Sequence, residues 1–423
     1  MRHATLALLL LLALGVRILF CLEVVGLHSP LRGDEIDYHR LAVSLASGEG
    51  FIDAYGDATA ARPPLYPVFL ACAYRFFGER PEAGRILQIA LGGVIVLLVY
   101  ALAKRMFSAP VALAATAFAA FSPSLIFISS YLLVENLYIV CLLSFLMLFF
   151  DGVDTAASSW RCFCGGIILG LSSLVRPNAF PLTLFVVASL LLFGRDRPAG
   201  RMAGAVVLLA AFFITLAPWA LRNEARLGEP VLFTTHGGMA FYQGNNQAVN
   251  DIPNYRGGVA PYEALPGWEE IKNMKSELAR DREGWRRGLS FIKDHPERLP
   301  RMLTWKFARF WRLRGDAGLS GVKSGWWWDK GRYLGKLASS IDVFLAYSAV
   351  SIPLFVFGLA ATARRWRRLV ILYGIIGMHT LTALVFYGSL RSRIPVEPVI
   401  ALFAAYSAVF LACRIRKAKE AGS

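Results

Sequence analysis

Two adjacent carboxylates open the first polar stretch of the chain, and they are the residues best suited to chemistry. Asp34 and Glu35 follow an apolar N-terminus, and Arg62 closes the same stretch before a pair of prolines. A carboxylate can take a proton from a hydroxyl group, and such general-base catalysis typically contributes about 10²–10⁴-fold. A guanidinium can hold a phosphate through its fork of N–H donors without a metal ion. The stretch therefore fits group transfer from a phosphate to a hydroxyl, although acids are also ordinary in a solvated loop.

Composition assigns the chain to the membrane proteins. Its 423 residues are 56% hydrophobic and 17% charged, with a mean hydropathy of +0.50, and a soluble domain cannot bury that much apolar surface. The net charge is +16, but the basic residues form short clusters between apolar runs, as in helices anchored at a phospholipid surface, so nucleic acid is not an expected partner. The six cysteines lie in or beside apolar runs and are predicted to be packed thiols.

Ten apolar runs predict ten membrane-spanning helices. They lie near 4–22, 83–103, 109–128, 131–150, 162–176, 179–193, 202–220, 340–361, 369–388 and 394–413. Several approach the roughly 20 residues that a span needs, whereas 162–176 and 179–193 are shorter. The first run resembles a signal peptide, but its apolar character continues to Leu22, and we expect an uncleaved span. Residues 64–78 are predicted to form a re-entrant or half-buried helix.

The basic clusters decide the predicted topology. If 64–78 does not cross, the clusters from Lys104 to the C-terminal tail share one face, which is cytoplasmic by the positive-inside rule. Both termini are then cytoplasmic. We expect three parts: a transmembrane module (1–220) with a catalytic external loop (23–63), a large external loop with amphipathic helices (221–339), and the last spans with a basic tail (340–423).

The predicted external face collects a second set of charged residues. Glu135 lies near the start of the fourth span, Arg176 joins the fifth and sixth, and Arg391 and Arg393 precede the last. Individually, the acid could cap its helix and the arginines could be anchors at the membrane interface. Their convergence with Asp34 on one face is what favours a site.

The large loop carries signals of a different kind. Residues 268–314 are predicted to be helical, with aromatic and basic residues interleaved from Arg301 to Arg314, which suits a membrane interface. Trp326 to Trp328 fit the same aromatic belt, and His236 is expected to be a hydrogen-bond donor in a loop.

An ordered series of short motifs carries a resemblance to a known family. The motifs are Gly33-Asp34-Glu35-x-x-Tyr38, Arg62-Pro63-Pro64-Leu65-Tyr66-Pro67, Ser122-Pro123 followed by Glu135, Gly170-Leu171 before Arg176-Pro177, Pro218-Trp219 with Arg222-Asn223, Gly237-Gly238 with Gly244-Asn245-Asn246, and Arg391-x-Arg393-x-Pro395. The chain resembles the GT-C membrane glycosyltransferases of the dolichyl-phosphate-mannose protein mannosyltransferase and aminoarabinose (lipid A) transferase type. The resemblance implies an all-α polytopic GT-C fold.

The resemblance also implies roles for individual residues. Asp34 would be the catalytic base, with Glu35 beside it, and Glu135 would help to arrange the site. Arg62 would contact the donor phosphate. Supporting phosphate contacts are expected from Arg176, Arg391 and Arg393, and other substrate contacts from Tyr38, Tyr66, Arg222 and Asn245.

The expected function is transfer of a sugar from a polyprenyl-phosphate donor to a hydroxyl group of a lipid, glycan or protein, with inversion at the sugar. We expect the reaction on the external face of the bacterial inner membrane. No cofactor is expected; a divalent metal is compatible with the chemistry but is not implied. The predicted cytoplasmic loops, such as 194–201 and 362–368, are too short for a nucleotide-binding βαβ unit of about 30 residues. The alternative is a transporter or flippase of lipid-linked sugars, which should carry charges near mid-membrane, where Arg17 is the clearest candidate.

Overall fold

The computed structural model describes residues 2–150, 159–313 and 343–421. These residues are helical almost throughout, and the only β pairing within them is an isolated bridge between Ile52 and Ala58. The predicted all-α fold is confirmed. Trp326 to Trp328 lie outside the described residues.

A helix occupies each of the ten positions where the sequence predicted a span. These helices are α1 (Arg2–Phe20), α4 (Pro81–Met106), α5 (Ala109–Ala120), α7 (Glu135–Leu148), α8 (Ser159–Val175), α9 (Ala179–Phe193), α10 (Pro198–Leu227), α17 (Val343–Thr362), α18 (Trp366–Val385) and α20 (Glu397–Ala421). In the described part of the chain, five helical stretches are long and apolar enough to cross a membrane: His3–Val25, Pro81–Met106, Pro198–Leu227, Val343–Val385 and Leu390–Glu420. The protein is therefore an integral multi-pass membrane protein, and the count of ten crossings stays a prediction.

The helices form one bundle in which distant parts of the sequence pack together. Helix α20 packs against α17 and against α5 from the first half of the chain, and its residues from Val399 to Ala405 are almost completely buried. Helices α8 and α10 approach closely at Gly166, where a Cβ atom would lie 2.2 Å from the carbonyl oxygen of Leu208. Small residues allow this close approach of backbones inside a membrane.

Arg17 has a structural explanation in this bundle. Its buried guanidinium donates hydrogen bonds to the carbonyl oxygens of Ala119 and Ala120 at 3.3 and 3.0 Å. These carbonyls end α5, and α6 (Pro123–Ile128) begins after the break at Ser122 and Pro123. A cation is favourable at a helix C-terminus, where carbonyl groups lack helical partners. Arg17 therefore caps a broken helix, which removes the main sequence argument for a transport path.

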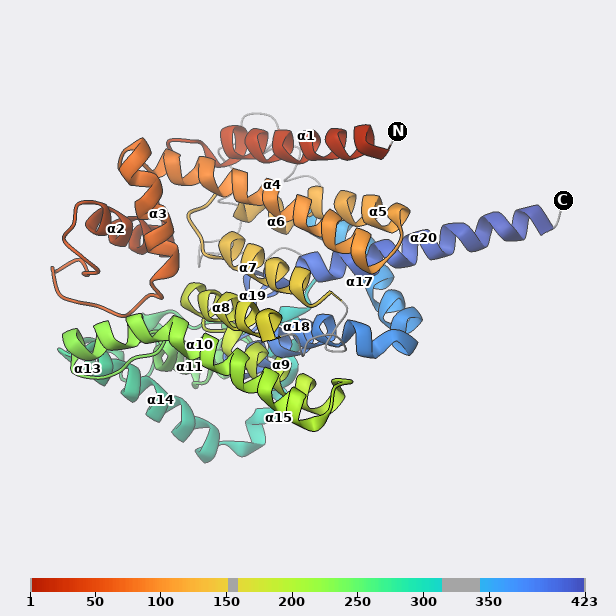
Figure 1. The fold of residues 1–423 in the computed structure, drawn as a ribbon. Helices are drawn as coiled ribbons and strands as arrows, with labels where there is room; N and C mark the ends of the chain where they lie inside the picture. The colour runs from red at the N-terminus through yellow and green to blue at the C-terminus, as the bar shows by residue number, and fades with distance from the viewer. Residues whose placement is uncertain (1, 151–158, 314–342, 422–423) are drawn as a thin grey trace.

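A second group of helices covers one end of the bundle. It comprises α2 (Asp34–Ala46), α3 (Leu65–Phe77), α11 (Gly237–Gly244), α12 (Ala248–Asp251), α13 (Trp268–Lys272), α14 (Glu277–Asp294), α15 (Leu299–Phe310) and α19 (Leu390–Arg393). In Figure 1, α2 and α3 lie at the end of the bundle opposite to both chain termini. The helix predicted at 64–78 is α3, with its inward side buried and Phe76 and Phe77 exposed.

The large loop is built around a close crossing of α11 and α14. A Cβ atom on Gly238 would lie 1.9 Å from the carbonyl oxygen of Asp281, and one on Gly284 would lie 2.5 Å from the carbonyl carbon of Gly238. The glycine pair noted in the sequence therefore serves helix packing. The predicted helical region 268–314 is divided into α13, α14 and α15, and Pro296 lies at the break between α14 and α15.

Candidate active site

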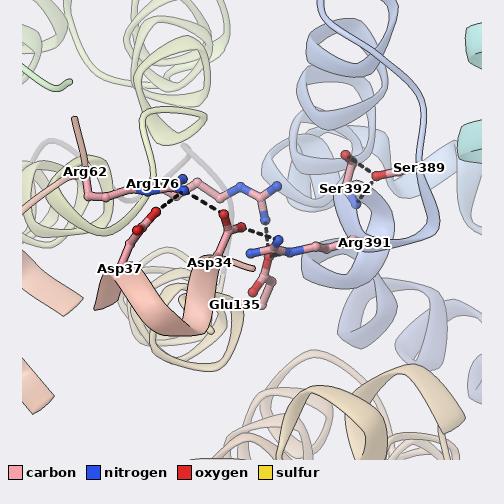
Figure 2. A network of polar contacts seen from close by, with 8 residues as sticks. All are labelled: Asp34, Asp37, Arg62, Glu135, Arg176, Ser389, Arg391 and Ser392. Carbon is pink, nitrogen blue, oxygen red and sulfur yellow. Dashed lines mark hydrogen bonds and ion pairs between the residues drawn. The ribbon is translucent and has the colours of Figure 1, made fainter. Parts of the chain in front are cut away.

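Six charged side chains from five separate segments form one continuous ion-pair network (Figure 2). The Asp34 carboxylate accepts hydrogen bonds from Arg62 Nη2 at 2.7 Å and from Arg391 Nη1 at 2.5 Å. Arg391 Nε also donates to Glu135 Oε1 at 2.6 Å. The same oxygen accepts from Arg176 Nη1 at 3.2 Å. Two of the site residues predicted from sequence, Arg62 and Arg391, thus contact the predicted base Asp34, and Glu135 and Arg176 are connected to it through Arg391.

The backbone places the acids of this network at helix starts. Gly33 has φ +51°, a conformation that favours glycine, and α2 begins at the next residue, Asp34. Helix α7 begins at Glu135 itself, later than the predicted start at 131. Both carboxylates therefore lie where the helix dipole favours negative charge.

Chain breaks place the arginines. Arg62 precedes Pro63 and Pro64, which lead into α3, and Arg176 follows the end of α8 because a proline comes next. Arg391 lies on the short helix α19. The Ser389 Oγ atom accepts from the Ser392 backbone N–H at 3.0 Å and caps that helix.

The large loop holds the segment before Arg62 from several sides. The Glu277 carboxylate accepts from the Ala60 backbone N–H at 2.8 Å and from the Thr59 hydroxyl at 2.7 Å. Arg222 donates to the carbonyl oxygens of Phe51 and Thr59 at 2.6 and 2.7 Å. Arg222 therefore holds the backbone that presents Arg62, and does not itself reach the network.

Charge and burial act in opposite directions on Asp34. Burial raises the pKa of its carboxyl, but the positive charges of Arg391 and Arg62 outweigh burial and hold the pKa well below the usual value. The side chain is 27% exposed and that of Arg391 is 24% exposed. Asp34 is therefore ionised at neutral pH and can be reached by a substrate.

His236 lies within reach of the same charges. Burial, followed by the positive charge of Arg62, lowers the pKa of His236 to about 4. The imidazole is therefore neutral near pH 7 and can exchange a hydrogen bond without adding charge. Hydrogen bonds between residues 234–235 and 60–61 bring this loop beside Arg62.

Besides Arg222, two of the predicted charged residues lie outside the network. Glu35 is buried and accepts from the backbone N–H groups of Leu132 and Arg32 at 3.0 and 3.3 Å, which ties neighbouring loops together. Arg393 is buried against Glu397, with an Nη2–Oε1 distance of 3.2 Å. The structure therefore places Glu35 and Arg393 in packing contacts.

The predicted aromatic residues lie directly beneath the network. The Arg62 guanidinium lies over the Tyr38 ring, 5.5 Å from its centroid. The Tyr38 and Tyr66 rings meet edge to face at 5.0 Å, and the buried Tyr66 hydroxyl accepts from Gln88 Nε2 at 2.5 Å. Tyr38 thus supports Arg62, while Tyr66 is covered by its neighbours.

Sequence reasoning missed two polar residues, one in the network and one in the large loop. Asp37 accepts from Arg62 Nη2 at 2.8 Å, and its position three residues after Asp34 on one helix face was the signal for it. Lys306, on α15, donates to the Oδ1 atom of Asn245 at 2.7 Å. Asn245 therefore contacts a buried lysine at a distance from the ion-pair network, and no local pattern marks that pair.

The network is suited to handling an anionic substrate. Among the described residues, no group of three or more His, Cys, Asp or Glu side chains is arranged to hold a metal ion. The arginine forks provide cationic donors, and Asp34 provides a base beside them. This pairing fits proton removal next to a departing phosphate.

The chain is similar to one sequence family and to several solved structures. Residues 61–221 match the family described as dolichyl-phosphate-mannose-protein mannosyltransferase. No curated protein matches the chain. Among solved structures, the oligosaccharyltransferase AglB of Archaeoglobus fulgidus, with an inhibitory peptide and a dolichol-phosphate, is similar over 100% of this chain and 52% of its own (16% identity, TM-score 0.56).

Two further structures are similar to the chain. The apo form of the Archaeoglobus fulgidus oligosaccharyltransferase matches over 99% of this chain and 52% of its own, with 15% identity and a TM-score of 0.58. ArnT from Cupriavidus metallidurans bound to undecaprenyl phosphate matches over 95% and 77%, with 14% identity and a TM-score of 0.48. The chain spans about half the length of the archaeal enzyme. The family match over residues 61–221 and the shared fold agree with the resemblance to GT-C membrane glycosyltransferases that the motifs carry.

Proposed function

We propose that the protein transfers a sugar from a polyprenyl-phosphate carrier to a hydroxyl group of a lipid, glycan or protein. The observation that carries this proposal is the position of Asp34, an ionised and partly exposed carboxylate held between Arg62 and Arg391. Dolichyl phosphate in the name of the matched family, and dolichol-phosphate in one similar structure, support a lipid-phosphate donor.

The arginines supply the donor side of the reaction. Arg62 and Arg391 each bind two carboxylates in the structure, Arg62 those of Asp34 and Asp37, and Arg391 those of Asp34 and Glu135. A donor phosphate can take over the N–H groups that now bind Asp34, while each arginine keeps its second carboxylate. Guanidinium forks bind phosphate oxygens well and stabilise the charge that grows on a departing phosphate.

The same exchange activates the base. In the structure the two arginines lower the pKa of Asp34 and make it a poor proton acceptor. When phosphate oxygens replace the carboxylate on these arginines, the pKa of Asp34 rises and its basicity returns. Donor binding thus prepares Asp34 to act.

The chemical step is a single displacement. Asp34 takes the proton of the acceptor hydroxyl, the hydroxyl oxygen forms a bond to the anomeric carbon, and the bond from that carbon to the phosphate oxygen breaks. Polyprenyl phosphate leaves as an anion held by the arginines. Attack opposite the phosphate inverts the anomeric centre.

We place this reaction on the external face of a bacterial inner membrane. In Figure 1 the end of α4, which carries Lys104 and Arg105, and the turn from α17 to α18, which carries residues 364–368, lie on the side of the bundle away from α2. The positive-inside rule predicts that this face is cytoplasmic. The charged network instead gathers at one end of the bundle, whereas a transporter should carry its ionisable groups near mid-membrane.

The test supplies the purified protein with an acceptor extract and one of two donors, with no other enzyme present. A polyprenyl-phosphate sugar should support transfer, and the matching nucleotide sugar should not. Asp34→Asn serves as the inactive control. Efficient transfer from the nucleotide sugar alone would contradict the proposal.

A further inference from the structure

A buried lysine connects the large loop to the end of a bundle helix. Lys306 is 1% exposed. Its Nζ atom donates to Asn245 Oδ1 at 2.7 Å and to the carbonyl oxygens of Leu384 and Val385 at 3.1 and 3.2 Å. The oxygens that it contacts are all neutral. The lysine is therefore bound through directional contacts to two separate segments.

The contacts of Lys306 lie at the end of α18. Leu384 and Val385 are the last residues of this helix, and their carbonyl groups lack a continuing helical turn, so a cation is favourable there. Asn245 closes the contact, because its Nδ2 group also donates to the Val385 carbonyl oxygen at 3.0 Å. Burial lowers the pKa of Lys306 to about 7.

Residues 386–389, here called the connector, join α18 to α19. The large loop packs against the connector at glycines: a Cβ atom on Gly244 would lie 1.9 Å from the Phe386 carbonyl oxygen, and one on Gly388 would lie 2.1 Å from the Lys306 carbonyl oxygen. The Gly388 backbone N–H also donates to the Gly257 carbonyl oxygen at 2.9 Å. The connector is therefore held along its length by the loop.

We propose that Lys306 is a positioning residue for Arg391, which lies two residues after the connector. By fixing the end of α18, Lys306 fixes the point from which α19 presents the Arg391 guanidinium to Asp34 and Glu135. This inference rests on the proposed function for the role of Arg391, and it adds a requirement that the external loop be docked before the site is complete.

Lys306 does more than fill space at this position. An apolar side chain of similar length would fill the same space without placing a charge in the interior, where burial of a cation is unfavourable. What Lys306 adds is directional hydrogen bonding to two segments at once. Loss of that direction should shift Arg391, and a misplacement of about 1 Å in a catalytic group can cost on the order of 10²-fold in rate.

The first measurement needs no substrate. Amide hydrogen exchange of residues 386–393 should become faster in Lys306→Met than in the wild type, and should be unchanged in Lys293→Met, which removes an exposed lysine of the same loop. Unchanged hydrogen exchange of this segment in Lys306→Met would overturn the proposal that Lys306 fixes the end of α18. Because the measurement uses no donor, it stays decisive even if the wild type were to show no transfer, a result that would remove the proposed function.

The second measurement couples Lys306 to Arg391. Lys306→Met should lower kcat/KM for the donor by about 10–10²-fold and leave the KM for the acceptor unchanged. Its effect should be smaller than multiplicative with Arg391→Lys, because residues that act through one another depart from additivity. A multiplicative loss in this double variant would overturn the positioning role.

A second variant covers a failure of Lys306→Met to fold. Gly388→Ala keeps the lysine but forces a methyl group against the Lys306 backbone, so it should displace the connector and lower donor kcat/KM in the same pattern. Wild-type kinetics of Gly388→Ala would contradict the inference.

Discussion

Asparagine in place of Asp34 removes the charge of the proposed base and nearly keeps its shape. After Asp34→Asn, Arg62 still contacts Asp37 at 2.8 Å and Arg391 still contacts Glu135 at 2.6 Å. Neither arginine is left without a carboxylate. We therefore expect a folded protein that loses about 1.5–3 kcal/mol of stability, the range for hydrogen bonds to charged groups.

The kinetic effects on kcat and on donor binding should point in opposite directions. Without a base, kcat should fall by at least about 10²-fold. Donor binding should become tighter by up to about 10-fold, equivalent to about 1.4 kcal/mol, because the phosphate no longer competes with Asp34 for Arg62 and Arg391. A variant that lowers kcat and the apparent donor constant together differs from one that is merely unstable.

Asp37→Asn is the matched control for this experiment. Asp37 lies on the same helix and contacts the same Arg62, but its described contacts do not include Arg391, and it is 45% exposed. An exposed ion pair contributes about 0–1 kcal/mol, so kcat should stay within about 3-fold. Single-turnover transfer from a polyprenyl-phosphate sugar measures both variants. Equal losses in the two, or near-wild-type turnover of Asp34→Asn, would refute the assignment of Asp34 as the base.

Three further predictions test the rest of the account. Arg62→Lys should recover only part of the donor affinity lost in Arg62→Ala, since a lysine lacks the fork; equal recovery in a binding titration would contradict this. The value of kcat/KM should be independent of pH from about pH 5 to about 6.5, because the pKa of Asp34 is below its usual value and that of His236 is about 4. The stability that ionised Asp34 contributes is present above its unfolded pKa and is lost only as pH falls through its lower folded pKa. A fall in kcat/KM on the acid side near about pH 6.5 would mean that another group titrates. In intact cells, Ala58→Cys should react with an impermeant thiol reagent and Ala363→Cys only after the membrane is opened; labelling of Ala363→Cys in intact cells would overturn the topology.

Local sequence signals predicted much of the fold. Apolar runs located the helices, and prolines lie at several of the breaks, such as the one between α5 and α6 at Pro123 and the end of α8 before Pro177. These signals are local because they depend on backbone geometry and on burial in lipid. The exact helix starts were less predictable, and α7 begins at Glu135 because residues 129–134 leave the helical path.

Spacing on a helix explains which of the neighbouring acids and arginines face the network. Neighbours on an α-helix point about 100° apart, and residues two apart point to nearly opposite sides. Glu35 therefore turns away from Asp34, and Arg393 turns away from Arg391 toward Glu397. Asp37 returns to the side of Asp34 for the same reason.

Long-range contacts account for the remaining features that the sequence did not predict. Lys306 lies 61 residues from Asn245 and 78 from Leu384. Arg222 supports Thr59 across 163 residues. Such pairs follow from how the large loop docks on the bundle, and no periodicity or motif in a single sequence encodes that docking.

The most direct test of the central claim follows both products of one reaction. Purified protein is given a polyprenyl-phosphate sugar and an acceptor extract, and free polyprenyl phosphate and transferred sugar are measured together. The account predicts that the two appear in equal amounts with the wild type and that both fall by at least about 10²-fold with Asp34→Asn. Sugar transfer without release of polyprenyl phosphate, or equal release by wild type and Asp34→Asn, would contradict it.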